Sequence, residues 1–285
     1  MPPSPEIDPA LEREYALRSR HPERGAVYER FAAASAAFRQ GTDAFRSLRY
    51  GASPNNAIDF VRAETTAAAP LFVFIHGGYW RALDRSIFTF LARPWLARGV
   101  HVALPGYDLA PALRVRDIAA QVEAATACLL ARAGPLGIDP DRIVVGGHSA
   151  GAQLGALLLD RLPRGAAGFI GVSGIYDLQP LRATSINADV RLDAGEAREL
   201  SPRWRVPDPR PRYLCAVGAA ETDGFRSQSH DYAAALRRQG CRAESIEVPG
   251  RTHFDVLDEL ADPESELFRK SLDLLRPPNE GTLSP

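Results

Sequence analysis

The sequence predicts an α/β protein in which helices cover both faces of a mostly parallel sheet. Two observations predict this fold class: short runs rich in apolar residues, and segments of helical length between them. The apolar runs are residues 71–75, 100–104, 142–146, 168–172, 212–217 and 243–248. The helical segments are residues 115–133, 150–162 and 225–239. Strands that are apolar at consecutive positions are typical of a parallel sheet buried on both faces.

The chain before the first of these runs predicts one helix and a pair of strands. Between residues 21 and 40, apolar side chains recur every three or four positions, as they do along one face of a helix. Residues 45–50 and 58–63 are expected to be strands, because the turn-forming sequence Ser53-Pro54-Asn55-Asn56 lies between them.

The domain organisation follows from the same alternation of strands and helices. It continues through residues 21–275, which we expect to form a single domain. Both ends of the chain are rich in proline. Termini of this kind predict a partly disordered extension over residues 1–20 and a disordered tail over residues 276–285.

Residues 176–210 interrupt the alternation, because they are too many for a simple connection between two strands. They contain a short helix signal, with Asp193 as N-cap and Glu196 three residues later. Ligands of parallel α/β sheets bind in the crevice at the carboxyl ends of the strands. We therefore expect this insertion to form a small cap over that crevice.

Charge and cysteine content limit the partners that the protein can have. Acidic and basic residues nearly balance, 35 against 34, which lacks the basic surplus of a nucleic-acid-binding face. The three cysteines are widely spaced and form no C-x-x-C pair, so we expect reduced thiols and a cytoplasmic protein. No apolar run approaches the ~20 residues of a membrane span, and no targeting segment is evident. The sequence is compatible with a homodimer.

The strongest chemical signal is Gly147-His148-Ser149-Ala150-Gly151, which follows an apolar run and opens a helical segment. This is G-x-S-x-G between a strand and a helix, the context of a nucleophilic serine on a sharp turn. The two glycines leave room for that turn. Ser149 then lies at a helix N-terminus, where backbone N–H groups favour developing negative charge.

A nucleophilic serine needs a general base, and His253 is the predicted one. It lies in the loop after the last strand, where a Ser–acid–His order places the histidine. The other five histidines lie in the two glycine-rich motifs or inside helix and strand patterns: His21, His76, His101, His148 and His230. The acid that orients His253 should follow the preceding strand, and Glu221 and Asp223 both do.

A second strand runs into His76-Gly77-Gly78-Tyr79-Trp80. Glycines at this position let backbone N–H groups face the oxyanion of a tetrahedral intermediate. The N–H group of Ala150 is expected to be the partner donor.

His76-Gly77-Gly78-Tyr79-Trp80 resembles the H-G-G-x-W signature of the kynurenine formamidase (arylformamidase) family of α/β-hydrolases. The serine motif agrees with that family, as do the stretches that begin at Ser173 and Val217. The resemblance implies an α/β-hydrolase fold with Gly78 and Tyr79 as oxyanion donors. The catalytic acid of the family is usually aspartate. Alignment with the family brings Glu221 to that position, so the resemblance favours Glu221, and Asp223 remains the alternative.

The resemblance implies hydrolysis of N-formyl-L-kynurenine to kynurenine and formate, through a formyl group on Ser149. Neither a metal nor a cofactor is expected, since the histidines have no ligand-like spacing. Trp80 is expected either to contact the aryl ring of the substrate or to pack under its own loop. Asn187, Arg182 and Arg191 are candidates from the cap for binding the polar end of the substrate.

Two other functions remain open. A carboxylesterase for small acyl esters uses the same triad and differs only in its acyl pocket. A catalytically silent hydrolase-fold binding protein would normally lack the serine or the histidine, and this sequence has both.

Overall fold

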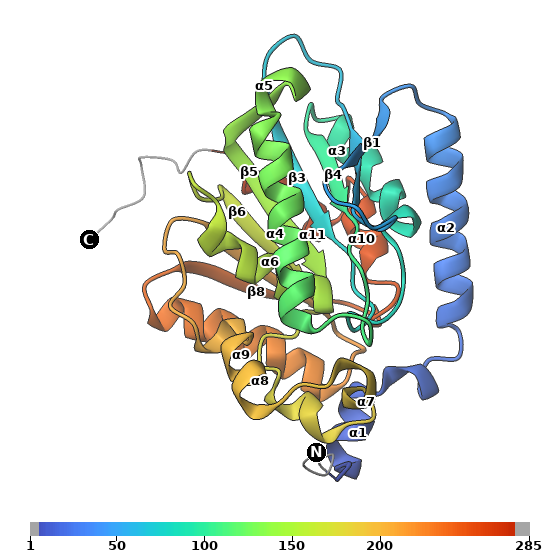
Figure 1. Cartoon of the computed structure of the whole chain (residues 1–285), viewed down its shortest axis with the longest axis vertical. Helices are drawn as coiled ribbons and strands as arrows, with labels where there is room; N and C mark the ends of the chain where they lie inside the picture. The colour runs from blue at the N-terminus through green and yellow to red at the C-terminus, as the bar shows by residue number, and fades with distance from the viewer. Residues whose placement is uncertain (1–5, 277–285) are drawn as a thin grey trace.

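The computed structural model describes residues 6–276, which build one eight-stranded sheet in the order β1-β2-β4-β3-β5-β6-β7-β8 (Figure 1). The strands are β1 Phe45–Arg49, β2 Ala57–Val61, β3 Ala69–Ile75, β4 His101–Pro105, β5 Ile138–His148, β6 Gly168–Val172, β7 Arg212–Gly218 and β8 Arg242–Val248. Strand β2 pairs antiparallel with β1 and β4, and the pairs from β4 through β8 are all parallel. The carboxyl ends of the parallel strands therefore meet at one edge.

Helices cover both faces of this sheet. One face packs on α4 (Val115–Ala131), α6 (Ala150–Leu158) and α9 (Asp223–Arg238). The other packs on helices and a 3₁₀ turn from both ends of the chain: α2 Arg24–Gln40, η2 Arg85–Leu91, α3 Ala92–Leu96, α10 Leu257–Ala261 and α11 Glu266–Asp273. This three-layer arrangement is the predicted fold class.

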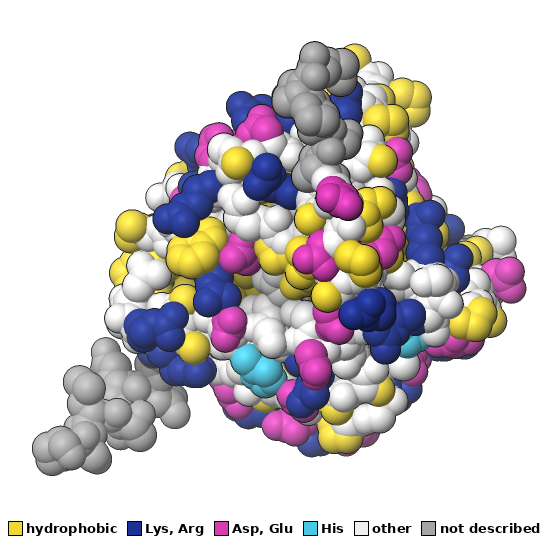
Figure 2. All heavy atoms as spheres, turned by 90° about the horizontal axis from the view of Figure 1, so that it is seen from below, with side chains coloured by type: hydrophobic (Ala, Val, Ile, Leu, Met, Phe, Trp, Pro, Cys, Tyr) yellow, Lys and Arg dark blue, Asp and Glu magenta, His cyan; other side chains and the backbone are white. Residues whose placement is uncertain are grey.

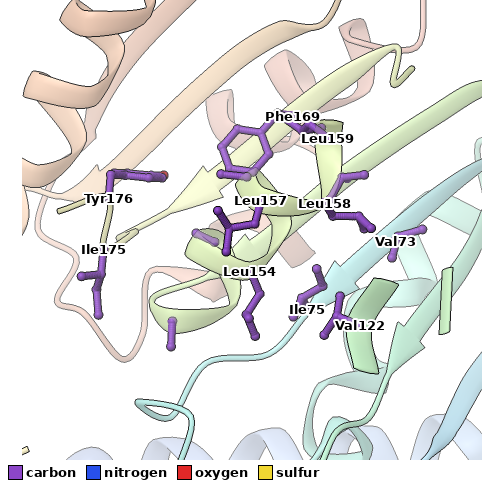
Figure 3. Close-up of a cluster of buried hydrophobic side chains, with 14 of the residues drawn as sticks. Val73, Ile75, Val122, Leu154, Leu157, Leu158, Leu159, Phe169, Ile175 and Tyr176 are labelled. Carbon is purple, nitrogen blue, oxygen red and sulfur yellow. The ribbon is translucent and has the colours of Figure 1, made fainter. Parts of the chain in front are cut away.

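The two hydrophobic cores are separated by the sheet, and β3 contributes to both. Val73 and Ile75 pack in one core, whereas Phe72 and Phe74 pack in the other. In Figure 3, Val73 and Ile75 lie beside Val122 of α4 and the leucines of α6. Side chains alternate between the faces of a strand, so a strand buried on both faces must be apolar at consecutive positions.

All six apolar runs are strands, and each of the predicted helical segments contains a helix. The boundaries differ where polar residues continue an element. Strand β5 begins at Ile138, which pairs with Ala69, and ends at His148, so the predicted run lies inside a longer strand. Helix α2 begins at Arg24 rather than residue 21, because His21 lies in the turn that precedes the helix.

The N-terminal segment, defined here as residues 8–28, is largely helical. It contains α1 (Pro9–Tyr15), η1 (Leu17–Ser19) and the start of α2. Asp8 caps α1 by accepting from the N–H groups of Ala10 and Leu11. Residues 1–20 and 276–285 are predicted to be partly disordered and disordered, respectively. Residues 1–5 and 277–285 lie outside the described residues, whereas residues 9–15 and 17–19 of the predicted extension are helical.

The insertion over residues 176–210 forms short elements beside α1 and α9: η4 Gln179–Ala183, α7 Asn187–Val190, α8 Ala194–Glu199 and η5 Pro202–Trp204 (Figure 1). Asp193 accepts from the N–H of Glu196, as the N-cap signal predicts. The Glu196 carboxylate is buried and binds Arg114 and Arg116 at the start of α4.

The insertion and the N-terminal segment both lie at the carboxyl edge of the sheet (Figure 1). Figure 2 views the molecule from this end and shows basic and acidic side chains interspersed over it. Among residues 6–276, no helix is both long and apolar enough to cross a bilayer.

Candidate active site

Ser149 lies on the sharp turn between β5 and α6, with φ 57° and ψ −120°. A non-glycine residue rarely has this conformation, so the surrounding packing must hold it there. The turn requires close backbone contacts. A Cβ atom on Gly151 would lie 2.0 Å from the Ile75 carbonyl oxygen, and one on Gly147 would lie 2.3 Å from that of Gly151. Both glycines of the motif are therefore needed by the turn itself.

His253 follows β8 and is hydrogen-bonded to a buried carboxylate. Its Nδ1 lies 2.7 Å from Oε2 of Glu221, and the two side chains are 5% and 0% exposed. The other candidate acid, Asp223, is 90% exposed and pairs with Arg226 on α9. The geometry therefore brings Glu221 to the histidine, and leaves Asp223 at the surface.

The Glu221 carboxylate is itself held by two donors. Its Oε1 accepts from the Gly218 N–H at 2.7 Å and from the Ser173 hydroxyl at 2.5 Å. Ser173 lies directly after β6 with φ 51°, so the strand end aims its side chain at the acid. Sequence reasoning gave Ser173 no role of its own. Its position immediately after a predicted strand is the signal that could have identified it.

His148, in the turn that carries Ser149, is hydrogen-bonded to the backbone of His253. Its Nε2–H donates to the His253 carbonyl oxygen at 2.8 Å, and the two ring centroids lie 4.7 Å apart. Burial, with a contribution from the neighbouring imidazole of His253, holds the pKa of His148 well below its usual value. A neutral His148 can keep its Nε2 proton as the donor and adds no positive charge beside His253.

The loop after β3 presents unpaired backbone donors next to Ser149. Among residues 6–276, the N–H groups of Gly78, Tyr79 and Ala150 have no protein acceptor. The loop has positive φ at three successive residues, 110° at Gly78, 52° at Tyr79 and 56° at Trp80. A Cβ on Gly78 would lie 2.2 Å from the Ala82 carbonyl oxygen, so only glycine fits there. Such donors can stabilise an oxyanion.

His76 and Tyr107 hold the start of this loop. Their rings are stacked with centroids 4.3 Å apart, and the Tyr107 hydroxyl donates to the His76 carbonyl oxygen at 2.7 Å. His76 Nδ1 is hydrogen-bonded to the Gly77 carbonyl oxygen at 2.8 Å. Burial lowers the pKa of His76 to about 4, so the ring stays neutral in this contact at neutral pH.

Trp80 and Asn187, two of the candidates for contacting substrate, have hydrogen-bond partners elsewhere. Trp80 is fully buried, and its Nε1–H donates to Oε1 of Gln153 on α6, so it packs under its own loop. The Asn187 amide binds backbone atoms of Arg182 and Leu192 and closes the turn around α7. Neither residue lines the cavity above Ser149.

That cavity has a volume of about 270 Å³. Residues in the loops that follow the strands line it: Gly78, Tyr79, Ala82, Leu83, His148, Ser149, His253 and Phe254. Residues of the N-terminal segment line it as well: Leu17, Arg18, Arg24 and Tyr28. Sequence reasoning expected the insertion over residues 176–210 to cover the crevice, and it assigned no wall to the N-terminal segment.

Several hydrogen bonds fix the N-terminal segment over the site. The Tyr79 hydroxyl donates to the Tyr15 carbonyl oxygen at 2.6 Å. The Thr222 hydroxyl donates to the Glu14 carbonyl oxygen at 2.9 Å, and the Gly224 N–H donates to the Glu14 carboxylate at 2.7 Å. The segment is thus bound to the loop after β3 and to the start of α9.

The molecule also has a larger open hollow, of about 1000 Å³, away from this site. It lies beside the start of β3 and contains none of the residues around Ser149. Within the part of the chain that the structure describes, no group of three or more His, Cys, Asp or Glu side chains could hold a metal ion.

Comparisons with known proteins agree with the fold. Residues 72–256 match the family model of the α/β-hydrolase fold. Curated kynurenine formamidases from Drosophila melanogaster and Salmo salar are 32% identical over 237 residues and 29% identical over 260 residues. These alignments cover 78% of this chain and 78% of the fly protein, and 84% of this chain and 87% of the salmon protein.

A solved structure of a proposed thioesterase from Silicibacter sp. TM1040 superposes with a TM-score of 0.82 at 33% identity. The superposition covers 91% of this chain and 97% of that one. The resemblance that the sequence motifs indicated is confirmed. The chain belongs to the α/β-hydrolase family and is a homologue of kynurenine formamidases.

Proposed function

We propose that the protein hydrolyses an aryl formamide, N-formyl-L-kynurenine, to L-kynurenine and formate. One observation carries the proposal: Ser149, on its strained turn, shares a small cavity with His253, which is bonded to the buried Glu221. Homology to the curated kynurenine formamidases supports the choice of substrate.

In the first half of the reaction, Ser149 Oγ attacks the formyl carbon and its proton passes to His253 Nε2. Glu221 holds the ring by accepting from Nδ1–H and stabilises the imidazolium that forms. The formyl oxygen becomes an oxyanion and accepts from the N–H groups of Gly78, Tyr79 and Ala150. These donors are already free of other acceptors, so little reorganisation is needed.

In the second half, His253 gives its proton to the aryl nitrogen as the C–N bond breaks, and the aniline leaves. A water molecule then attacks the formyl carbon of the formyl-serine and passes its proton to His253. Collapse of that second intermediate releases formic acid and returns the proton to Ser149 Oγ. The net reaction adds one water across the amide bond.

The size of the cavity supports a small substrate. Its volume of about 270 Å³ lies at the lower end of ligand pockets, which are roughly 300–1,000 Å³. Formyl is the smallest acyl group, so most of the cavity remains for the leaving group. A carboxylesterase for small acyl esters is the second candidate, and the similarity to a proposed thioesterase favours it.

We also infer that the protein works in a reducing compartment such as the cytoplasm. Cys128, Cys215 and Cys241 are free thiols.

The experiment compares purified protein on N-formyl-L-kynurenine and p-nitrophenyl acetate, with Ser149→Ala as the blank. We expect a kcat/KM on the formamide that equals or exceeds the value on the ester. Because the amide is intrinsically the harder bond to break, this result would identify the protein as an arylformamidase. Rapid ester hydrolysis with an inert formamide would make the protein an esterase. Equal turnover by the Ser149→Ala variant would refute the mechanism, and no turnover of either substrate would indicate a binding protein.

A further inference from the structure

The cavity above Ser149 has two unneutralised cations in its outer wall. Arg18 and Arg24 both line it, together with Ser149 and His253. Among residues 6–276, neither arginine forms an ion pair, whereas the nearby acid Glu23 is hydrogen-bonded to His21 at 2.7 Å. A small cavity that contains a nucleophile and two unpaired guanidinium groups has the charge to attract an anionic substrate.

Arg24 fixes the position of Arg18. Its Nη1 donates to the Arg18 carbonyl oxygen at 2.6 Å and to the His21 carbonyl oxygen at 3.0 Å. The turn between η1 and α2 is thereby held closed. The side chain of Arg18 has no hydrogen-bond partner among the described residues, so its guanidinium donors remain free.

Tyr28 adds a neutral donor beside these cations. Burial raises the pKa of Tyr28 to about 12, although Arg18 and Arg24 oppose the shift, so the hydroxyl keeps its proton at neutral pH. Its ring meets Phe254 edge-on, with centroids 5.9 Å apart, and Phe254 directly follows His253. The phenol and the two guanidinium groups thus lie on the same wall, within one cavity of the nucleophile.

We propose that Arg18, held by Arg24 and assisted by Tyr28, binds a carboxylate on the leaving group of the substrate. The inference rests on the proposed function and assigns the residue that selects, among acylated aryl amines, those that carry a carboxylate. A guanidinium fork binds a carboxylate through two parallel hydrogen bonds, which orients the substrate as well as attracting it. The apolar side chains of Leu17, Leu83 and Phe254 would then contact the aryl part.

The test compares N-formyl-L-kynurenine with its carboxamide, which is neutral at the same position and nearly the same size. The variant is Arg18→Gln, and the matched control is Arg20→Gln, an exposed arginine two residues later that does not line the cavity. The quantity measured is the ratio of kcat/KM for the acid to kcat/KM for the amide. We expect Arg18→Gln to lower this ratio at least tenfold, chiefly through KM, and Arg20→Gln to leave it unchanged.

A ratio that stays within twofold of wild type in Arg18→Gln would overturn the proposal, as would an equal fall in Arg20→Gln. A wild-type measurement removes any dependence on folding of the variants. L-kynurenine should inhibit at least tenfold more strongly than its carboxamide, and rising salt should reduce this preference. Equal inhibition by the two compounds would likewise overturn it.

A second substrate pair separates this proposal from the proposed function. It consists of two aryl acetates, one with a carboxylate side chain and one with the corresponding carboxamide. One outcome is that the wild-type protein cleaves no formamide and yet prefers the acidic acetate, with that preference lost in Arg18→Gln. This result would support the carboxylate site and refute the formamidase assignment. If wild type cleaves the formamide with no dependence on Arg18, the assignment stands and the carboxylate site falls.

Discussion

The loops at the strand ends and the segments that cover them are held by different kinds of contact. Ser149, Glu221 and His253 each follow a parallel strand, so backbone pairing in the sheet sets their positions. The N-terminal segment and residues 176–210 are held largely by side chains, such as the Glu196 carboxylate on α4. Changes in the first group should act on kcat, whereas changes in the second should act on stability or on KM.

The largest effect should come from the acid. We expect Glu221→Gln to lower kcat/KM about 10³- to 10⁴-fold, because the amide no longer stabilises an imidazolium and favours the wrong tautomer of His253. Asp223→Asn is the matched control, since the Asp223 side chain is exposed, and it should change kcat/KM less than threefold. A severe loss of kcat/KM in Asp223→Asn with only a mild loss in Glu221→Gln would contradict the assignment of Glu221 as the acid.

The oxyanion loop should give the next largest effect. Gly78→Ala places a methyl group against the Ala82 carbonyl oxygen, so the loop must shift and its N–H donors with it. We expect kcat to fall about 10²- to 10³-fold, the cost of one lost oxyanion donor. Gly134→Ala, where no atom lies near the added methyl, is the control and should keep full activity. Full activity in Gly78→Ala would argue against this oxyanion site.

The covering segments should respond differently. Glu196→Gln removes the charge that Arg114 and Arg116 bind, and should lower the free energy of unfolding by about 1–3 kcal/mol. Chemical denaturation measures this change. The KM of the folded protein should stay within twofold of wild type, because residues 176–210 do not line the cavity. A large change in KM at unchanged stability would show that this insertion contacts substrate.

The smallest effect is expected from Asn187→Ala. The amide closes a turn in the insertion through bonds to Arg182 and Leu192, so its loss should cost about 1 kcal/mol of stability. Values of kcat/KM should stay within twofold of wild type for both the formamide and the ester. A tenfold fall in kcat/KM on the formamide alone would return Asn187 to the substrate site.

The same division of contacts explains how much of the molecule the sequence predicts. Ser149 and Gly78 are predicted from local patterns, because each lies in a glycine-rich turn that follows an apolar strand. His253 is predicted because it lies in the loop after the last strand. The choice between Glu221 and Asp223 cannot be made from local pattern, since both follow β7 closely. It depends on a turn in which the Glu221 carboxylate accepts from the Gly218 N–H and faces inward.

The cavity wall is harder to predict than the triad. Tyr28 contacts Phe254 although the two are far apart in the sequence, and no strand register links them. The role of Trp80 was also open, because an indole beside a glycine loop can face the substrate or the core. The indole faces the core because its Nε1–H donates to Oε1 of Gln153. Only the packing of α6 against the loop brings that acceptor within reach.

The central claim is that Ser149 is a nucleophile activated by His253, and covalent labelling tests it most directly. The protein is treated with a fluorophosphonate, and the modified residue is located by mass spectrometry of its peptides. We predict one adduct per chain, on Ser149, with labelling abolished in Ser149→Ala and slowed at least a hundredfold in His253→Ala. Labelling of another serine, or an undiminished rate in His253→Ala, would contradict the account.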